Sequence, residues 1–304
     1  MNSIRILVMI LIAPAAFVGA TPARPFQFTS SFQAFLAPNK PQAVAAADLN
    51  RDGKADLVCT GTDSVYIFLA TTESPFFQQI QELPNKNSSP VYGYAGSFAI
   101  GNVNGDSIPD LAIPNNAGAS VAIWHGDGSG RMIAAGEYAT GAGPSAVALA
   151  DFNRDGYVDF VSANNGAGTI TLWQGSSSFA FDHRTDIAVG TYTSFLAVGD
   201  LNRDGNPDVV VNGLTQVSLL LGNGDGTFRK TQLVPGQWPA FALGDVNGDG
   251  FDDVVLAGRN PSVCPGNGDG NTDIRLLGFR IDRDRRSERG SCSRSGRCRT
   301  RKRL

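Results

Sequence analysis

The sequence predicts an all-β fold, a β-propeller of four-stranded antiparallel blades. A nine-residue acidic pattern recurs five times, with starts 54, 49, 49 and 45 residues apart, and short apolar runs surround every copy. Repeats of this period are typical of propellers and other repeat architectures. Glycine supplies 36 of the 304 residues and 42% of the chain is apolar, which excludes a disordered chain and indicates a core with many turns.

Each repeat is predicted to supply four strands. One apolar run precedes every acidic copy, as at 146–150, and another follows it, as at 209–211; both are too short for helices. A third run is found in four repeats, at 65–69, 121–124, 170–173 and 217–221. A weaker fourth run begins near Phe76, Arg131, Phe179 and Phe228. Consecutive runs of this kind predict an antiparallel meander.

Sheets of this size are expected to stack face to face around an axis, because one alone cannot bury both faces. The segment 26–36 precedes the first complete unit and matches the outer strands of later units. The last unit ends early, at Ser262-Val263-Cys264. Two arrangements remain open: a ring of five blades closed by 26–36, or a truncated part of a larger propeller.

Three regions are expected along the chain. Residues 1–20 carry one basic residue, an apolar run of 13 residues and a cleavage site after Ala20, which predicts a signal peptide and a secreted protein. That run is too short to cross a bilayer, so no membrane span is expected after cleavage. Residues 21–271 form the propeller. Residues 272–304 form a basic tail, expected to be disordered and interpreted as a polyanion-binding arm, a cysteine-linked extension or a frameshift product.

Charge and composition exclude several functions. Residues 21–271 hold 24 acidic against 12 basic residues, and this surface would repel nucleic acid. The two histidines, His125 and His183, leave little scope for histidine catalysis. The chain is therefore predicted not to be an enzyme, with no catalytic residue assigned. Its cysteines are too few for a disulfide framework, and their pairing stays open; they are Cys59, Cys264, Cys292 and Cys298.

The acidic repeats have the composition of calcium loops. Side-chain oxygens at positions 1, 3, 5 and 9 and the carbonyl at position 7 would surround one ion, and position 6 is glycine in four copies. Calcium takes six to eight oxygen ligands, whereas magnesium needs a stricter octahedron. The predicted ligands are Asp48, Asn50, Asp52, Lys54, Asp56, Asn102, Asn104, Asp106, Ile108, Asp110, Asp151, Asn153, Asp155, Tyr157, Asp159, Asp200, Asn202, Asp204, Asn206, Asp208, Asp245, Asn247, Asp249, Phe251 and Asp253.

Asp, Asn and Gly also form ordinary turns, but five copies in register use 14 of the 24 acidic residues and favour a metal function. Without an ion, the crowded carboxylates would repel one another. Up to five calcium sites are expected. Loop 102–110 is expected to bind most weakly, because Asn102 replaces an aspartate and Ser107 replaces the glycine.

Together with the Gly-Asn-Gly-Asp-Gly-Thr-Phe stretch at 222–228, these loops resemble the FG-GAP/VCBS repeats of bacterial secreted proteins and of integrin α chains. The resemblance covers about 26–271. It implies a calcium-stabilised propeller, usually of seven blades, in exported proteins that act in adhesion or ligand binding. We therefore expect an adhesion or interaction scaffold with a protein or glycan ligand. A glycan-binding lectin and a polysaccharide lyase or hydrolase are the alternatives.

Two other recurring groups favour structural roles. Trp124 and Trp173 align with Phe68 and Leu220 on the third strand, which indicates packing between blades rather than a sugar-stacking platform. The arginines at loop position 4 are interpreted as solvated counter-charges to the loop carboxylates rather than as a rim for an anionic ligand; they are Arg51, Arg154 and Arg203.

Overall fold

The computed structural model describes residues 42–61, 64–72, 76–84, 98–178, 180–258 and 261–266, with the backbone alone at 230–233. These ranges contain strands and no helix, so none of their segments is a membrane-spanning helix. The predicted all-β class is confirmed there. The predicted signal peptide, the segment 26–36 and the basic tail lie outside the described residues.

Five antiparallel sheets follow one another along the chain, and within each the strands pair in chain order. The strands are β1 (Ala43–Ala47), β2 (Asp56–Thr60), β3 (Ser64–Ala70) and β4 (Phe77–Pro84); β5 (Ala99–Gly101), β6 (Asp110–Asn115), β7 (Ser120–Gly126) and β8 (Met132–Ala139); β9 (Pro144–Ala150), β10 (Asp159–Asn164), β11 (Thr169–Gly175) and β12 (Phe181–Ala188); β13 (Leu196–Gly199), β14 (Asp208–Asn212), β15 (Gln216–Gly222) and β16 (Phe228–Pro235); β17 (Ala240–Gly244), β18 (Asp253–Ala257) and β19 (Ser262–Cys264). The predicted meander is confirmed, including the short last strand.

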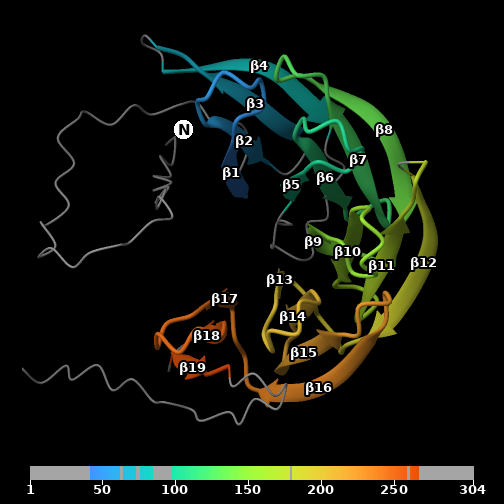
Figure 1. The fold of residues 1–304 in the computed structure, drawn as a ribbon, viewed down its shortest axis with the longest axis vertical. Coiled ribbons are helices and arrows are strands. Elements are labelled where there is room, and N and C mark those ends of the chain that lie inside the picture. The colour runs from blue at the N-terminus through green and yellow to red at the C-terminus, as the bar shows by residue number, and fades with distance from the viewer. Residues whose placement is uncertain are drawn as a thin grey trace, which may run out of the picture.

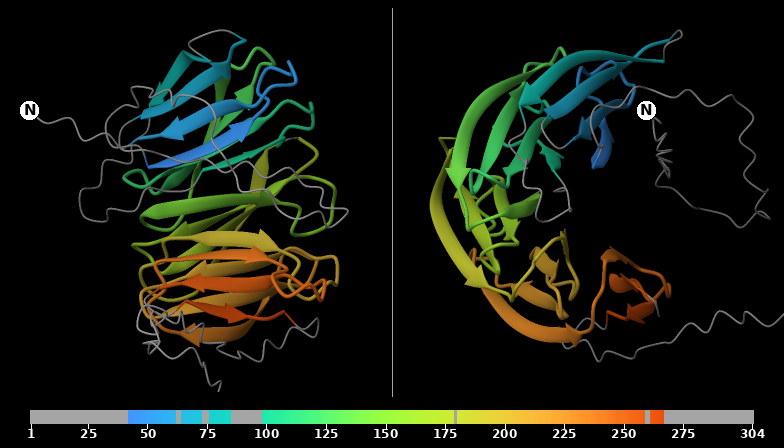
Figure 2. Two further views of the ribbon diagram at one scale, coloured as in Figure 1. Left: turned by 90° about the vertical axis from the view of Figure 1, so that its left-hand side faces the viewer. Right: turned by 180° about the vertical axis from the view of Figure 1, so that it is seen from behind.

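The sheets stack face to face along an open arc (Figure 1). The first strand of each sheet lies on the inside of the arc, and β4, β8, β12 and β16 run along its outside (Figure 1). The first and last sheets lie apart on the open side, as the view from behind also shows (Figure 2). The described residues therefore form a propeller-type arrangement in which the sheets do not close into a ring.

Burial explains the composition of the strands. Every residue of the second strands β6 and β10 is buried, because these strands lie between neighbouring sheets. The outer strands β8 and β12 begin with a buried residue and then expose much of their length. Continuous apolar runs therefore mark the second strands, whereas polar residues interrupt the outer ones.

One apolar cluster fills each of the four junctions between adjacent sheets. Ile67 and Leu111 belong to the cluster between the first two sheets. In the cluster between the second and third sheets, the rings of Phe160 and Phe181, both from the third sheet, pack edge to face with centroids 4.8 Å apart. The third junction is formed around Val161 and Val209. The fourth includes Val210, Val254 and the thiol of Cys264. The core is thus divided into repeated interfaces between sheets.

The residue at loop position 2 connects each sheet to the next. Leu49, Val103, Phe152 and Leu201 are 0%, 7%, 1% and 4% exposed, and each belongs to the cluster shared with the following sheet. Val246, at the same position of the last loop, is 57% exposed. No further sheet follows it among the described residues, so this apolar side chain is left in solvent.

Candidate metal centre

The five acidic loops occupy equivalent places in the five sheets. Each joins the first strand of a sheet to the second, and its ninth residue is the first residue of that second strand. In loop 151–159, β9 ends at Ala150 and β10 begins at Asp159. All 25 residues predicted as ligands lie within the described ranges, and the sheets bring each group of five into a single turn.

The aspartate at position 9 is buried in every loop, with 0% exposure. One of its oxygens, Oδ2, accepts the N–H of position 2 at 2.7–2.9 Å. The other, Oδ1, accepts an N–H at 2.7–2.9 Å: that of the last residue of the third strand in four sheets, and that of Gly266, two residues after β19, in the last sheet. These five carboxylates are Asp56, Asp110, Asp159, Asp208 and Asp253. Each oxygen keeps a second lone pair for a further ligand, except Asp253 Oδ1, which also accepts the Asn247 side-chain amide N–H at 3.4 Å.

The remaining side chains organise the turn, as in loop 151–159. Asp151 accepts the N–H groups of Asp155 and Gly156 at 3.1 and 2.9 Å. Asn153 Oδ1 accepts the Asp155 N–H at 3.1 Å, and Asp155 Oδ1 accepts the N–H of Tyr157 at 2.8 Å. The last two bonds recur in all five loops. The predicted ligand oxygens therefore already face one turn of the backbone.

The backbone is left-handed at two positions of every loop. The position-6 glycines of the other four loops have φ of 81–89°, and in loop 102–110 Ser107 adopts 65° in the place of this glycine. Position 4 is also left-handed, with φ of 58–60° in Arg51, Arg154 and Arg203. Only the glycine at position 6 was expected. A side chain in this conformation costs about 1 kcal/mol, so three arginines hold an unfavourable geometry.

Burial and like charge both act on the carboxylates of Asp159 and Asp208. Burial, with a smaller contribution from the Asp151 and Asp155 charges, raises the pKa of Asp159 to about 6. The pKa of Asp208 is raised to about 6 for the same reasons, with Asp200 and Asp204 as the neighbouring charges. Neither carboxylate forms an ion pair among the described residues. A bound cation would relieve this unfavourable burial of charge.

Loop 48–56 differs because it contains its own cation. The ammonium of Lys54 donates to Asp52 Oδ2 at 2.8 Å, and this bond lowers the pKa of Asp52. In the other four loops, the same oxygen of the position-5 aspartate accepts the side-chain amide N–H of the asparagine at position 3. An ion bound through this oxygen would share it with the ammonium in one loop and with the amide in the others, or displace them.

Loop 102–110 departs from the others at position 1. Asn102 Oδ1 is buried and has no hydrogen-bond partner among the described residues. The position-1 aspartates of the other loops accept backbone N–H groups instead. Across the part of the chain that the structure describes, no three acidic, histidine or cysteine side chains form a closed ligand group. The donor set nevertheless consists of oxygen atoms, the ligand type that calcium prefers.

The arginines at position 4 reach beyond their own loops. They are exposed, but each side chain contacts the following loop: Arg51 Nη2 donates to the Asp106 carbonyl at 2.9 Å, and Arg154 Nη1 to Asn206 Oδ1 at 3.2 Å. Arg203 lies 4.6 Å from the ring centroid of Phe251. The charge of Arg154 contributes to the lowered pKa of Asp204 in the following loop, which agrees with a counter-charge to the loop carboxylates. The arginines in addition link successive loops, which was not expected. Sequence reasoning missed this because the partners lie about 50 residues away.

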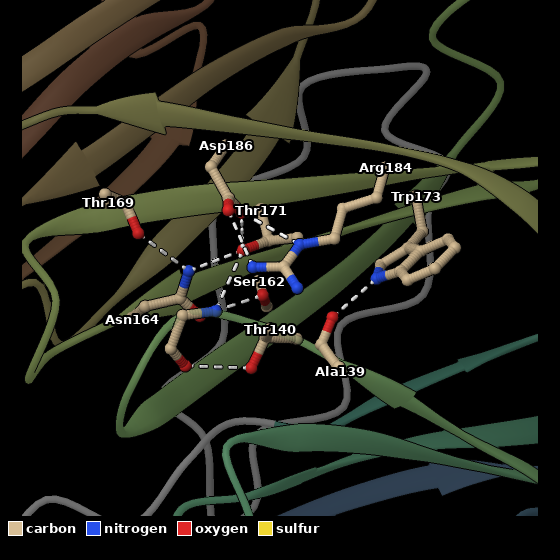
Figure 3. Close-up of polar contacts among 10 residues, drawn as sticks. Ala139, Thr140, Ser162, Asn164, Thr169, Thr171, Trp173, Arg184 and Asp186 are labelled. Atoms are coloured by element: carbon tan, nitrogen blue, oxygen red, sulfur yellow. Dashed lines mark hydrogen bonds and ion pairs between the residues drawn. The ribbon is translucent and has the colours of Figure 1, made fainter.

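The tryptophans pack as predicted. Trp124 lies against the cluster between the first two sheets, and Trp173 against the next one. The Trp173 indole N–H donates to the Ala139 carbonyl of the preceding sheet at 2.8 Å (Figure 3). Both rings belong to junctions between sheets, which confirms the packing interpretation.

A polar cluster lies at the other end of the strands, away from the acidic loops. In the third sheet, Thr171 Oγ1 donates to Asp186 Oδ1 at 2.6 Å and accepts the side-chain amide N–H of Asn164 at 2.8 Å (Figure 3). In the second sheet, Ser120 and Asn115 both donate directly to Glu137 Oε1, at 2.7 and 2.6 Å. Asp186 is satisfied by this hydroxyl and by an ion pair with Arg184 at 2.6 Å, and Glu137 by a hydroxyl and an amide group. The clusters therefore join strands and offer no evident metal site.

The cysteines of the described residues suggest no further chemistry. Cys59 is partly buried and Cys264 fully buried, and neither forms a disulfide there. Burial raises the pKa of the Cys264 thiol to about 11, which makes it a poor nucleophile. Cys292 and Cys298 lie outside the described residues.

Similar proteins agree with this architecture. A lectin from Agrocybe aegerita that recognises non-reducing terminal N-acetylglucosamine has a TM-score of 0.52 and 18% identity, covering 76% of this chain and 64% of its own. BBS1N, solved in complex with ARL6DN, has a TM-score of 0.50 and 16% identity, and the match covers 75% of this chain and 65% of the BBS1N chain. This chain thus spans just under two thirds of their length, and the likeness shows the fold alone. No curated protein sequence matches the chain significantly.

The repeats themselves identify the family. The FG-GAP-like repeat matches three overlapping segments, 102–162, 151–211 and 204–256, which together cover about half of the chain. The FG-GAP repeat matches residues 41–68. Every segment contains one or more of the acidic loops described above. The chain therefore belongs to the FG-GAP repeat family.

Proposed function

We propose that this chain is a secreted, calcium-binding interaction scaffold. Calcium at the five loops would hold each first strand to the second strand of its sheet and would stabilise the junctions between sheets. The observation that carries the proposal is the burial of Asp159 and Asp208 beside two further carboxylates of their own loops. Their surroundings favour a cation, and the available donors are oxygen atoms.

In each loop, the position-1, position-3, position-5 and position-9 side chains and the position-7 carbonyl would hold the ion. Calcium would supply charge neutralisation and nothing more, since no reaction is proposed. Loop 102–110 remains the predicted weakest site, because it has two carboxylates and a serine at φ 65°. Calorimetric titration of loop variants tests this order; filling of this loop first would overturn it.

The metal proposal is tested with the purified full chain. Elemental analysis after dialysis is expected to find calcium at up to five ions per chain, and calcium should raise the melting temperature above that in chelator. At a free calcium concentration 100 times the Kd of a site, binding at that site adds about 2.7 kcal/mol to the free energy of unfolding. Asp204→Asn should reduce this gain, whereas Asp182→Asn, an exposed change of equal charge on β12, should not. Equal melting temperatures with calcium and chelator would contradict the proposal.

The partner is proposed to be a protein or a glycan that binds the rim or the junctions between sheets. Support comes from the fold alone, since a lectin is among the structurally similar proteins. A glycan array probed in calcium tests the glycan class, and pull-down from a matched extracellular fraction tests the protein class. Release of unsaturated sugar products from polysaccharides would instead favour a lyase and contradict a purely binding role.

A further inference from the structure

Three arginines form contacts between successive acidic loops. Arg51 of the first loop donates to the Asp106 carbonyl of the second at 2.9 Å. Arg154 of the third loop donates to Asn206 Oδ1 of the fourth at 3.2 Å. Each contact thus joins position 4 of one loop to position 5 or 7 of the next, in the direction of the chain.

The guanidinium groups also cover the backbone of the loop that they reach. A Cβ added to Gly250, position 6 of the fifth loop, would lie 2.4 Å from Arg203 Nη2, and one added to Gly205 would lie 3.7 Å from Arg154 Nη2. A Cβ at Gly224, in the turn that ends the fourth sheet's third strand, would meet Arg154 Cδ at 3.2 Å. The exposed side chain of Arg154 therefore lies against both the fourth loop and this turn.

The series of contacts has one interruption. Gly105 stands at position 4 of the second loop and has no side chain that can reach the third loop. Where an arginine is present it adopts a left-handed backbone that glycine adopts more easily. An unfavourable residue kept in the same geometry, with its side chain on the next loop each time, indicates a role for that contact.

We propose that the position-4 arginines are positioning residues that order the following loop for its cation, so that loops three, four and five form one coupled group and loops one and two another. This inference rests on the proposed calcium binding. When the arginine of one loop holds the next loop in place, that next loop has less conformational entropy to lose on binding its ion. Arg154 and Arg203 transmit this effect within the larger group, and Arg51 within the smaller one.

Hydrogen exchange of the full chain, measured by mass spectrometry along a calcium titration, resolves the loops separately. Arg154→Gln is expected to shift the calcium midpoint of loop 200–208 upward about fivefold, the effect of losing one ordinary hydrogen bond, and to leave loop 151–159 within about twofold. In chelator it should speed exchange in loop 200–208. Arg229→Gln, an exposed change of equal charge on β16, should do neither.

The outcomes separate the two proposals. If calcium protects no loop of the unaltered chain, calcium binding fails, and exchange in chelator still tests the arginine contact. If calcium protects the loops but Arg154→Gln changes loops 151–159 and 200–208 equally, the arginine acts within its own loop and the inference is wrong. Gly105→Arg gives an independent test: it should lower the calcium midpoint of loop 151–159, and an unchanged midpoint would also contradict the inference.

Discussion

The backbone N–H of Gly175 donates to Asp159 Oδ1 at 2.7 Å and so ties the end of β11 to the first residue of β10. A Cβ at Gly175 would lie 2.3 Å from the Val158 carbonyl oxygen, a distance that real contacts do not show. Gly126 and Gly222 make the same bond in their own sheets with similarly little space. Glycine is required here by close approach of two backbones.

Gly175→Ala is therefore expected to lower the free energy of unfolding by about 1–3 kcal/mol, because the strands must separate to admit the methyl group. Ala70 stands at the equivalent place in the first sheet and donates to Asp56 Oδ1 at 2.8 Å. Ala70→Gly should cost less, about 0.5–1 kcal/mol, through chain entropy. Urea denaturation compares the two, and an equal loss would show that space at Gly175 is not limiting.

Val103 and Val246 provide a matched pair for the packing of loops against sheets. Val103 is 7% exposed within the cluster of the second junction, and Val246 is 57% exposed at the end of the arc. Val103→Ala should lower the free energy of unfolding by about 2 kcal/mol, from two buried methyl groups and the cavity that remains. Val246→Ala should change it by less than about 0.5 kcal/mol.

Thermal and chemical denaturation of both variants checks this difference. A similar loss at the two positions would mean that Val246 is covered in solution, by another part of the chain or by a second molecule. Gel filtration across a concentration series would then distinguish these arrangements, because only association between molecules depends on concentration.

Much of the fold could be predicted because its information is local and repeated. All four strands of a sheet were located from apolar runs, and the short last strand was predicted from Ser262-Val263-Cys264 before Pro265. Closure was left open, because the angle between sheets depends on how large side chains such as Phe160 and Tyr138 fit together at a junction. No local pattern encodes that angle.

The site was predicted as a set of residues but not as a connected rim. Five copies of one loop identify the oxygen donors, yet a solvated Arg154 and one bonded to Asn206 have the same local sequence. The apolar residue at position 2, such as Leu49, is a signal that was available in every copy and marks the junction to the next sheet. The left-handed position 4 gave no such signal, since arginine rarely adopts that conformation.

Lys54→Gln tests whether the ammonium in the first loop competes with a metal ion. The side chain donates to Asp52 Oδ2 at 2.8 Å, while the predicted ligand of this residue is its backbone carbonyl. Removing the charge should tighten calcium binding at loop 48–56 about two- to fivefold, an effect that salt should diminish. Hydrogen exchange of this loop along a calcium titration measures it, with Arg229→Gln as the control for net charge. Weaker binding in Lys54→Gln would exclude competition.

The raised carboxyl pKa values predict opposite pH trends with and without calcium. Asp159 and Asp208 have a pKa of about 6 in the folded chain, against an ordinary value of 3.8. The folded state thus binds these protons more tightly than the unfolded state, and their contribution to stability is complete below about pH 4 and lost as the pH rises through about 6. Carboxyls whose pKa is lowered, such as Asp204, act in the opposite sense but below about pH 4.

In chelator, the melting temperature should therefore rise as the pH falls from 7 to 5. In calcium, the gain over chelator should shrink across the same interval, because protons compete with the ion for the same oxygens. Asp159→Asn and Asp208→Asn together should flatten the chelator curve between pH 4 and 6, whatever their effect on absolute stability. A chelator curve that falls between pH 7 and 5 would mean that these two carboxylates do not carry the burial cost that the metal is proposed to relieve.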